Sequence, residues 1–191
     1  MADDRLATAP ALALVELASI ARGHRAADAM LKRAPVELLR AEWVSPGKYL
    51  VLVAGDVASV EEAFKSGLDV AGDRLIDRLI LQQAHEEIWP ALRGEATAAR
   101  AGGVQSLGVV ETSTVAATIG GADAAAKAAA VRISEMQLAR GIGGKAFFTV
   151  TGPLAEVEAS VEAALLVVTD ARLQATEIIP APHEDLAAKL R

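Results

Sequence analysis

Residues 141–146 have the spacing of a dinucleotide-binding motif. They read Gly-Ile-Gly-Gly-Lys-Ala and match G-x-G-x-x-G/A, in which a helix must follow the glycines and present its N-terminus to a pyrophosphate. The next four residues are Phe-Phe-Thr-Val, which favour a strand. We therefore interpret 141–146 as a glycine-rich hairpin turn. A phosphate-binding P-loop is excluded too, because Ala139 and Ala146 stand where that motif needs Gly and Ser or Thr.

Other patterns for nucleophiles and metal ligands are missing. Ser106 lies in a glycine-bounded stretch that has one residue too many for G-x-S-x-G and leads into an expected strand. No two of the three histidines have the helical spacing of a metal site. His85 and His183 begin expected short helices, where we predict a structural or capping role. The sequence therefore predicts no catalytic site, no metal site and no enzyme activity.

Composition excludes several classes of function. The 191 residues include no cysteine, which excludes disulfides, thiolate zinc sites, cysteine nucleophiles and cysteine-bound iron–sulfur clusters. A net charge of −6 and an aromatic content of 3% argue against nucleic acid, which needs clustered Lys and Arg and stacking side chains. The longest apolar runs are about six residues, far short of the roughly 18 that a membrane span needs.

Two further features concern location and assembly. Asp3 and Asp4 stand where a secretory signal would have Lys or Arg, so we expect a cytoplasmic protein without a membrane partner. Hydrophobic residues make up 52% of the chain, which is unusually many for a small monomer. We therefore expect part of the apolar surface to face other subunits.

An internal repeat organises the chain. The pattern Asp-Ala-x-x-Lys begins at Asp28 and again at Asp123, 95 residues later. The offset is 97 between the Gly-Lys pairs at 47–48 and 144–145, which indicates a two-residue insertion in a loop of the second copy. The repeat predicts two domains of the same fold, over 11–92 and 106–191, joined by an Ala- and Gly-rich linker over 93–105.

Each domain is expected to contain four strands, two helices and a short C-terminal helix. Apolar alternation marks strands, and apolar residues at steps of three to four mark helices. Residues 45–48, Ser-Pro-Gly-Lys, suit a tight turn, and Asp56 suits a helix N-cap. The order β-α-β-β-α-β predicts an α+β, ferredoxin-like fold. In the first domain the expected strands cover 12–18, 36–44, 49–54 and 75–81, and the expected helices cover 20–34, 57–72 and about 85–92.

These same segments carry a resemblance to a known family. In the first domain, 13–23, 27–32, 45–48 and 53–56 are similar to bacterial microcompartment shell domains, as are 107–112, 141–145 and 180–184 in the second. The similarity covers roughly residues 11–191. Two such domains in unpermuted order resemble the tandem, trimer-forming shell proteins, such as the T-type of propanediol-utilisation compartments.

The resemblance implies a structural shell protein of the bacterial cytoplasm. Three chains would form a homotrimer, a pseudohexagonal tile that packs with hexameric and pentameric shell proteins around metabolic enzymes. The loops between the second and third strands would line a central pore for small metabolites. The residues so implied are Ser45, Pro46, Gly47, Lys48, Gly141, Ile142, Gly143, Gly144 and Lys145.

Ser45 distinguishes the implied pore from that of similar tandem proteins. Those have a cysteine at this position, and three such thiolates hold an iron–sulfur cluster. A serine hydroxyl is a poor iron ligand near neutral pH, so we predict no cluster, no other cofactor, and a pore ringed by three hydroxyls. Lys48, Arg140 and Lys145 would either favour anionic metabolites or point outward and keep the tile soluble. The sequence leaves both interpretations open.

Lys32 and Lys127 match the edge lysine of the family, which contacts its counterpart on a neighbouring tile. The alternative is a pair of solvated helix lysines. The family often has an arginine ahead of the terminal histidine, where this chain has Gln83 and Ala181. This departure leaves open a different tiling strength or a different neighbour.

A second class of function also fits the expected fold. Ferredoxin-like repeats bind metabolites between subunits, and a fold alone does not determine a function. A metabolite-binding regulatory module therefore remains the alternative to a shell protein.

Overall fold

The computed structural model describes residues 10–94 and 104–189, and within them the chain divides into two compact units. Unit 1 contains the residues up to Ala84 together with Arg140–Gly144. Unit 2 contains His85–Ala139 and the residues from Lys145 onward. Each unit combines one sheet with helices, which confirms the expected α+β class.

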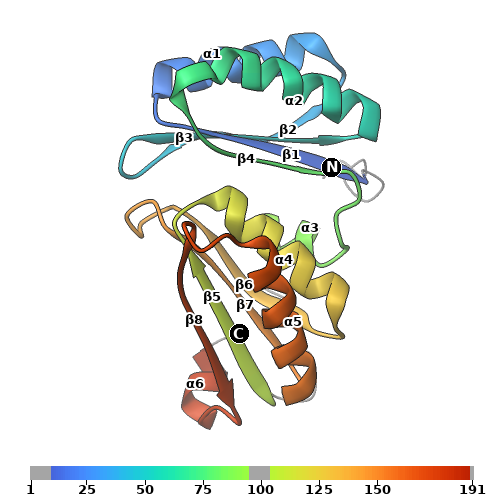
Figure 1. Cartoon of the computed structure of the whole chain (residues 1–191), viewed down its shortest axis with the longest axis vertical. Coiled ribbons are helices and arrows are strands. Elements are labelled where there is room, and N and C mark those ends of the chain that lie inside the picture. The colour runs from blue at the N-terminus through green and yellow to red at the C-terminus, as the bar shows by residue number, and fades with distance from the viewer. Residues whose placement is uncertain (1–9, 95–103, 190–191) are drawn as a thin grey trace. The chain divides into compact units, whose positions relative to one another are not determined.

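Unit 1 contains a four-stranded antiparallel sheet with two helices on one face (Figure 1). The strand order is β2-β3-β1-β4, so the first strand is central and the second is at an edge. The expected element order is confirmed. The elements are β1 (Ala11–Leu17), α1 (Ile20–Arg33), β2 (Glu37–Val44), β3 (Lys48–Gly55), α2 (Val57–Ala71), a 3-10 turn (Gly72–Arg74) and β4 (Leu75–Leu81).

Unit 2 repeats this arrangement, with strand order β6-β7-β5-β8 and β6 at an edge. Its main helices, α4 and α5, lie on one face of its sheet (Figure 1). The elements are α3 (Ile88–Leu92), β5 (Ser106–Thr112), α4 (Val115–Ala128), β6 (Arg132–Leu138), β7 (Ala146–Gly152), α5 (Leu154–Val167), β8 (Leu173–Pro180) and α6 (Glu184–Lys189).

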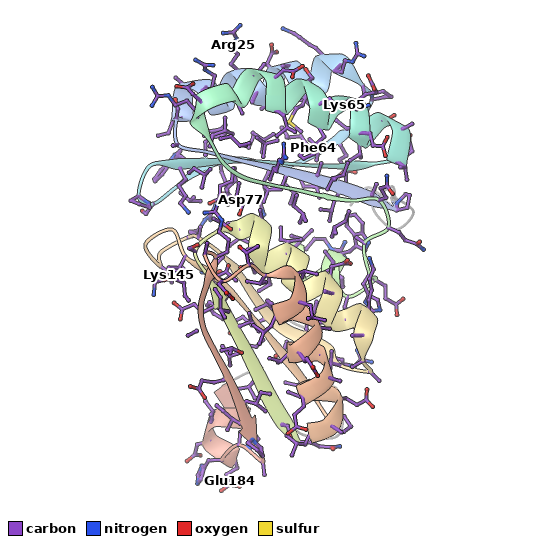
Figure 2. All side chains as sticks on the ribbon, in the orientation of Figure 1. Arg25, Phe64, Lys65, Asp77, Lys145 and Glu184 are labelled. Atoms are coloured by element: carbon purple, nitrogen blue, oxygen red, sulfur yellow. The ribbon has the colours of Figure 1, made fainter. Side chains whose placement is uncertain are left out.

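The core of unit 1 lies between its sheet and the inner faces of α1 and α2. Alternate residues of a strand point to one face, and here that face is apolar. Phe64 lies on the sheet side of α2, whereas Arg25 lies on the outer side of α1 (Figure 2). The helices present mostly small side chains to the strands, which lets the two layers approach closely. The buried core includes Ala11, Ala13, Val15, Leu17, Tyr49, Val51 and Val53 from strands and Ala26, Met30, Val60 and Ala63 from helices.

Both predicted turns are present. Gly47, in the turn between β2 and β3, has a φ of 92°. In the turn between β6 and β7, Gly141, Gly143 and Gly144 have φ values of 77°, 66° and 80°, a conformation that glycine adopts without a steric penalty. β7 begins directly afterwards, at Ala146. Because a strand and not a helix follows the glycines, the hairpin interpretation is confirmed.

The short helix α3 lies in unit 2, although the sequence placed it at the end of the first domain. It packs against α4 and β6. The His85 backbone N–H, just before this helix, donates to Asp123 Oδ1 at 2.8 Å. The order of elements along the chain does not show which sheet a short helix covers.

Asp56 caps α2, as the sequence predicted. Its Oδ1 accepts a hydrogen bond from the Ser59 backbone N–H at 3.0 Å. Hydrogen bonds from the Ser59 side chain and then from its backbone lower the pKa of the Asp56 carboxyl. Because the folded-state pKa is lowered, the cap stabilises unit 1 above the unfolded-state pKa, and this stability is lost as the pH falls through the folded-state value.

We therefore expect Asp56→Asn to reduce the acid-induced loss of thermal stability. Asparagine keeps a capping oxygen but has no charge to titrate below about pH 4. Thermal unfolding between about pH 3 and pH 7 measures the effect, with the exposed Asp73→Asn as a control. An identical acid-induced decrease in Asp56→Asn and the unsubstituted chain would contradict the prediction.

Candidate functional site

The implied pore residues in unit 1 come from two turns that lie against each other. One turn, residues 45–48, joins β2 to β3, and the other contributes Arg140–Gly144 to the same unit. Lys48 Nζ donates a hydrogen bond to the Gly144 carbonyl at 3.0 Å. A Cβ on Gly144 would lie 2.6 Å from the Ser45 carbonyl oxygen and from Pro46 Cδ. Glycine is therefore required at residue 144 both by its positive φ and by this close approach.

The remaining implied residues differ in exposure and in the unit to which they belong. Ser45, Gly47, Gly141 and Gly143 are exposed, and Ile142 is half-buried. Lys145 is exposed and belongs to unit 2. The structure thus brings Ser45, Pro46, Gly47 and Lys48 together with 141–144 in unit 1.

Lys48 forms a buried ion pair that the sequence analysis missed. Its Nζ lies 2.8 Å from Oε1 of Glu16, whose side chain is 0% exposed. Glu16 lies opposite Leu50 in the antiparallel pairing of β1 with β3, so Lys48 is its diagonal neighbour on the same face of the sheet. This pairing holds a carboxylate and an ammonium together at the base of the 45–48 turn.

Unit 2 contains the same pair at equivalent positions. Lys145 Nζ lies 2.7 Å from Glu111 Oε1, and Glu111 lies opposite Phe147 in the pairing of β5 with β7. This second pair is considerably more exposed than the first. The repeat contained the signal for both pairs, because each copy has a glutamate near the end of its first strand and a lysine at the start of its third.

Arg140 is paired as well. Its guanidinium contacts Glu42 Oε2, and Glu42 also accepts a hydrogen bond from Arg40 at 3.0 Å. Lys48, Arg140 and Lys145 therefore each have a carboxylate partner. Their positive charge is largely compensated, a state that neither of the two sequence interpretations considered.

The two candidate edge lysines have different surroundings. Each is paired with the aspartate four residues earlier: Lys32 with Asp28 at 2.7 Å and Lys127 with Asp123 at 2.6 Å. Lys32 and Asp28 are both exposed, whereas the Asp123 side chain is almost completely buried. The repeat-equivalent lysines are thus not equivalent in exposure.

The histidines have local structural contacts. The ring Nδ1 of His85 accepts from the Glu87 backbone N–H at 3.3 Å, and that of His183 accepts from Asp185 N–H at 3.2 Å. These contacts agree with the predicted capping role. His24 Nδ1 lies 3.2 Å from the Tyr49 hydroxyl, and burial, followed by the Glu42 carboxylate, raises the pKa of Tyr49.

Residues 10–94 and 104–189, which the structure describes, contain no cluster of three His, Asp or Glu side chains that could hold a metal ion. No helix in those ranges is both long enough and apolar enough to span a bilayer. The residues at the turns also do not fit the iron–sulfur cluster of similar tandem proteins, because Ser45 offers a hydroxyl and the sequence has no thiolate.

Comparison with known proteins identifies the class. The BMC domain family matches residues 11–84 and 106–182, which cover the two sheet-and-helix repeats. The chain therefore belongs to the BMC domain family and is a shell protein of a bacterial microcompartment with two such domains in tandem.

Individual relatives match either nearly the full length of the chain or one of its repeats. The bacterial microcompartment shell protein PduT of Citrobacter freundii is 40% identical over 177 residues, covering 92% of this chain and 95% of PduT. The carboxysome shell protein CsoS1 of Prochlorococcus marinus is 38% identical over 85 residues, covering 43% of this chain and 82% of CsoS1. The tandem organisation is thus shared with PduT, whereas one CsoS1 chain corresponds in length to one repeat.

Solved structures support the same assignment. A microcompartment protein from Desulfitobacterium hafniense DCB is 41% identical and superimposes with a TM-score of 0.81, covering 94% of this chain and 98% of the other. A fused, permuted hexameric shell protein of the RMM microcompartment shares the fold at 21% identity and a TM-score of 0.61, covering 82% and 80% of the two chains. These comparisons favour the shell protein over the regulatory module.

Proposed function

We propose that three copies of this chain form a homotrimeric, pseudohexagonal tile without enzyme activity. The observation that carries the proposal is the presence of two units of one fold in a single chain. Three tandem chains supply six such units, which is the number that a closed hexagonal ring requires. One CsoS1 chain corresponds in length to one repeat, so a tandem chain carries the equivalent of two such shell-protein chains.

Exposed apolar side chains support assembly with other chains. Trp43 on β2 and Leu166 and Val167 at the end of α5 are more than half exposed. Obligate interfaces bury such groups, and aromatic residues are enriched in them. Hexameric and pentameric shell proteins would adjoin the tile, with Lys32 and Lys127 at its edges. Lys32 is the more exposed of the two and would have the greater freedom to reach a neighbour.

In this tile, the turns around Ser45 and Gly144 would surround a central pore for small metabolites. The contact between the two turns supports this arrangement, because Lys48 bonds to the Gly144 carbonyl and Ser45 and Pro46 lie against Gly144. Each nearby cation has a carboxylate partner. We therefore infer that passage is governed by pore diameter, hydroxyl groups and backbone dipoles more than by net positive charge.

The mass of the protein in solution tests the assembly. Light scattering is expected to give three times the 19.7 kDa mass of one chain, independently of concentration in the micromolar range. A monomer mass under these conditions would refute the tile. A trimer that also binds a small ligand saturably but never enters shells would favour the regulatory module.

Substitution of Ser45 tests the pore geometry. If three copies of residue 45 converge on one axis, Ser45→Cys supplies three thiolates that hold an iron–sulfur cluster after reconstitution with iron and sulfide. We expect this variant to gain visible absorption, and Ala58→Cys, at an exposed position of α2, to stay colourless under the same conditions. A colourless Ser45→Cys trimer would show that the three residues do not meet.

A further inference from the structure

The segment after β4 is held on unit 2 by two carboxylates. The His85 N–H donates to Asp123 Oδ1 at 2.8 Å. The Ile133 N–H, on the edge strand β6, donates to Glu87 Oε2 at 3.3 Å, and Arg132 Nη1 lies 3.6 Å from Glu87. The next side chain, Ile88, is 0% exposed. The sequence His-Glu-Glu-Ile thus docks a short helix over the edge of a sheet.

The segment after β8 has the same features but lacks such a site in unit 2. His183, Asp185 and Leu186 follow His85, Glu87 and Ile88 at a constant offset of 98 residues. The histidine Nδ1 accepts from the N–H two residues later in both segments, at 3.3 and 3.2 Å. Leu186 is nevertheless 41% exposed. Figure 1 shows α6 at the end of β8, apart from α4 and α5, and Figure 2 shows Glu184 at this outer position.

Unit 1 has an aspartate–lysine pair equivalent to the one that binds the segment after β4 in unit 2. Asp28 Oδ2 accepts from Lys32 at 2.7 Å, just as Asp123 Oδ2 accepts from Lys127 at 2.6 Å. The second oxygen of Asp123 binds the His85 N–H, and its side chain is only 6% exposed. The Asp28 side chain is 60% exposed, and among the described residues only Lys32 bonds to it.

The edge strand of unit 1 matches that of unit 2 in register. Leu38 on β2 lies opposite Val53, and Ile133 on β6 lies opposite Val150, which is the repeat equivalent of Val53. The equivalent register directs the Leu38 N–H away from the sheet, as it does that of Ile133. Leu38 is exposed, whereas Ile133 is buried.

We propose that the C-terminal segment of one copy, His183–Lys189, docks on Asp28 and the β2 edge of a second copy of this chain. The His183 N–H donates to Asp28, the Asp185 carboxylate accepts from the Leu38 N–H, and Leu186 is buried as Ile88 is. The contact is head-to-tail and closes into a ring when the rotation permits. The inference rests on the proposed trimer, in which the observed contact within each chain would alternate with this contact between chains.

The contact between chains is weaker than the observed one. Glu37 stands where unit 2 has Arg132, since these residues lie opposite Ala54 and Thr151. Asp185 therefore faces a like charge where Glu87 has an arginine. Asp185 is also one methylene shorter than Glu87. The contact thus depends mainly on Asp28 and on the burial of Leu186.

Cross-linking tests which chain the segment contacts. The chain has no cysteine of its own, so Asp28→Cys and His183→Cys can be prepared separately, mixed, left to exchange subunits, and then treated with a short bismaleimide. The matched control carries Asp123→Cys and His85→Cys in one chain, where the two residues are already in contact. We expect covalent dimers only in the mixture, and internally linked single chains in the control.

The outcomes separate this inference from the proposed tile. Light scattering could give a trimer, and the control chain could form its internal cross-link, while the mixture gives no covalent dimer. This result would overturn the docking and leave the proposed tile unaffected. Internally linked single chains in an Asp28→Cys/His183→Cys double variant would overturn the docking as well. A monomeric unsubstituted chain would refute the tile itself.

Subunit exchange gives a second measurement that requires no cross-link. We expect Asp28→Ala to speed exchange between labelled and unlabelled trimers at least tenfold, about 1.4 kcal/mol, whereas the exposed Asp73→Ala does not change it. Glu37→Arg introduces the arginine that unit 2 has at the equivalent position, Arg132, and should slow subunit exchange. Unchanged exchange in both Asp28→Ala and Glu37→Arg would contradict the proposal.

Discussion

Replacing Lys48 with methionine is expected to lower the free energy of unfolding by about 3–5 kcal/mol. Lys48 Nζ lies 2.8 Å from a Glu16 carboxylate that is completely buried. Without the ammonium, that charge stays in a low-dielectric environment without its cationic partner, and burial of such a charge is costly. The substitution also removes the hydrogen bond to the Gly144 carbonyl, so the two turns lose a direct connection.

Lys145→Met is the matched control. It breaks the equivalent pair with Glu111, but that pair is largely solvated, and exposed ion pairs contribute about 0–1 kcal/mol. Urea denaturation at a constant protein concentration measures both variants. The double variant Glu16→Gln/Lys48→Met should be less destabilised than Lys48→Met alone, because no buried charge remains. Equal effects of Lys48→Met and Lys145→Met would show that burial of Glu16 is not the cause.

Gly23→Ala is expected to destabilise unit 1 by about 3 kcal/mol. A Cβ at Gly23 would overlap Cβ, Cγ and Cδ1 of Tyr49, and these atoms lie too close to the backbone to move easily. Alanine in a helix normally stabilises the folded protein relative to glycine by about 0.5–1 kcal/mol. A loss of stability in Gly23→Ala would therefore indicate the steric overlap with Tyr49. The repeat supports the explanation, because unit 2 has Thr118 in place of Gly23 and Ala146 in place of Tyr49.

Gly67→Ala provides the comparison for this substitution. Its Cβ would meet the Met30 side chain, with Sδ at 2.6 Å, but a methionine side chain is flexible and can rearrange. We expect Gly67→Ala to be much less destabilising, and Tyr49→Ala to rescue part of the Gly23→Ala effect in the double variant. Urea denaturation gives the coupling energy of this cycle. Strictly additive effects would show that Gly23 and Tyr49 do not constrain each other.

Local features of the fold were predictable from short-range patterns. The expected helix over 20–34 is observed as α1 (Ile20–Arg33), and the strand over 75–81 is observed as β4 (Leu75–Leu81). Apolar periodicity and turn residues act within a few residues, so they predict such elements well. The Asp56 cap and the hairpin at 141–145 were predictable for the same reason.

The candidate site was predictable only in part. The resemblance pointed to the turns at 45–48 and 141–145, and the structure brings 45–48 and 141–144 together in unit 1. The partners of the cations were missed, because Glu16 and Lys48 are 32 residues apart and meet only through the register of β1 with β3. A charge pattern read along the chain does not show which charges the sheet pairs.

The amino-acid sequence alone determined the duplicated α+β architecture, the turn positions and the absence of any thiolate ligand. Periodicity, turn chemistry and residue type are local properties that need no knowledge of distant contacts. Three features depend on the three-dimensional fold: α3 covers β6, Asp123 is buried while Asp28 is exposed, and Lys48 is neutralised by a buried glutamate. Burial and pairing depend on segments far apart in the chain, so equivalent residues of the two repeats acquired different environments.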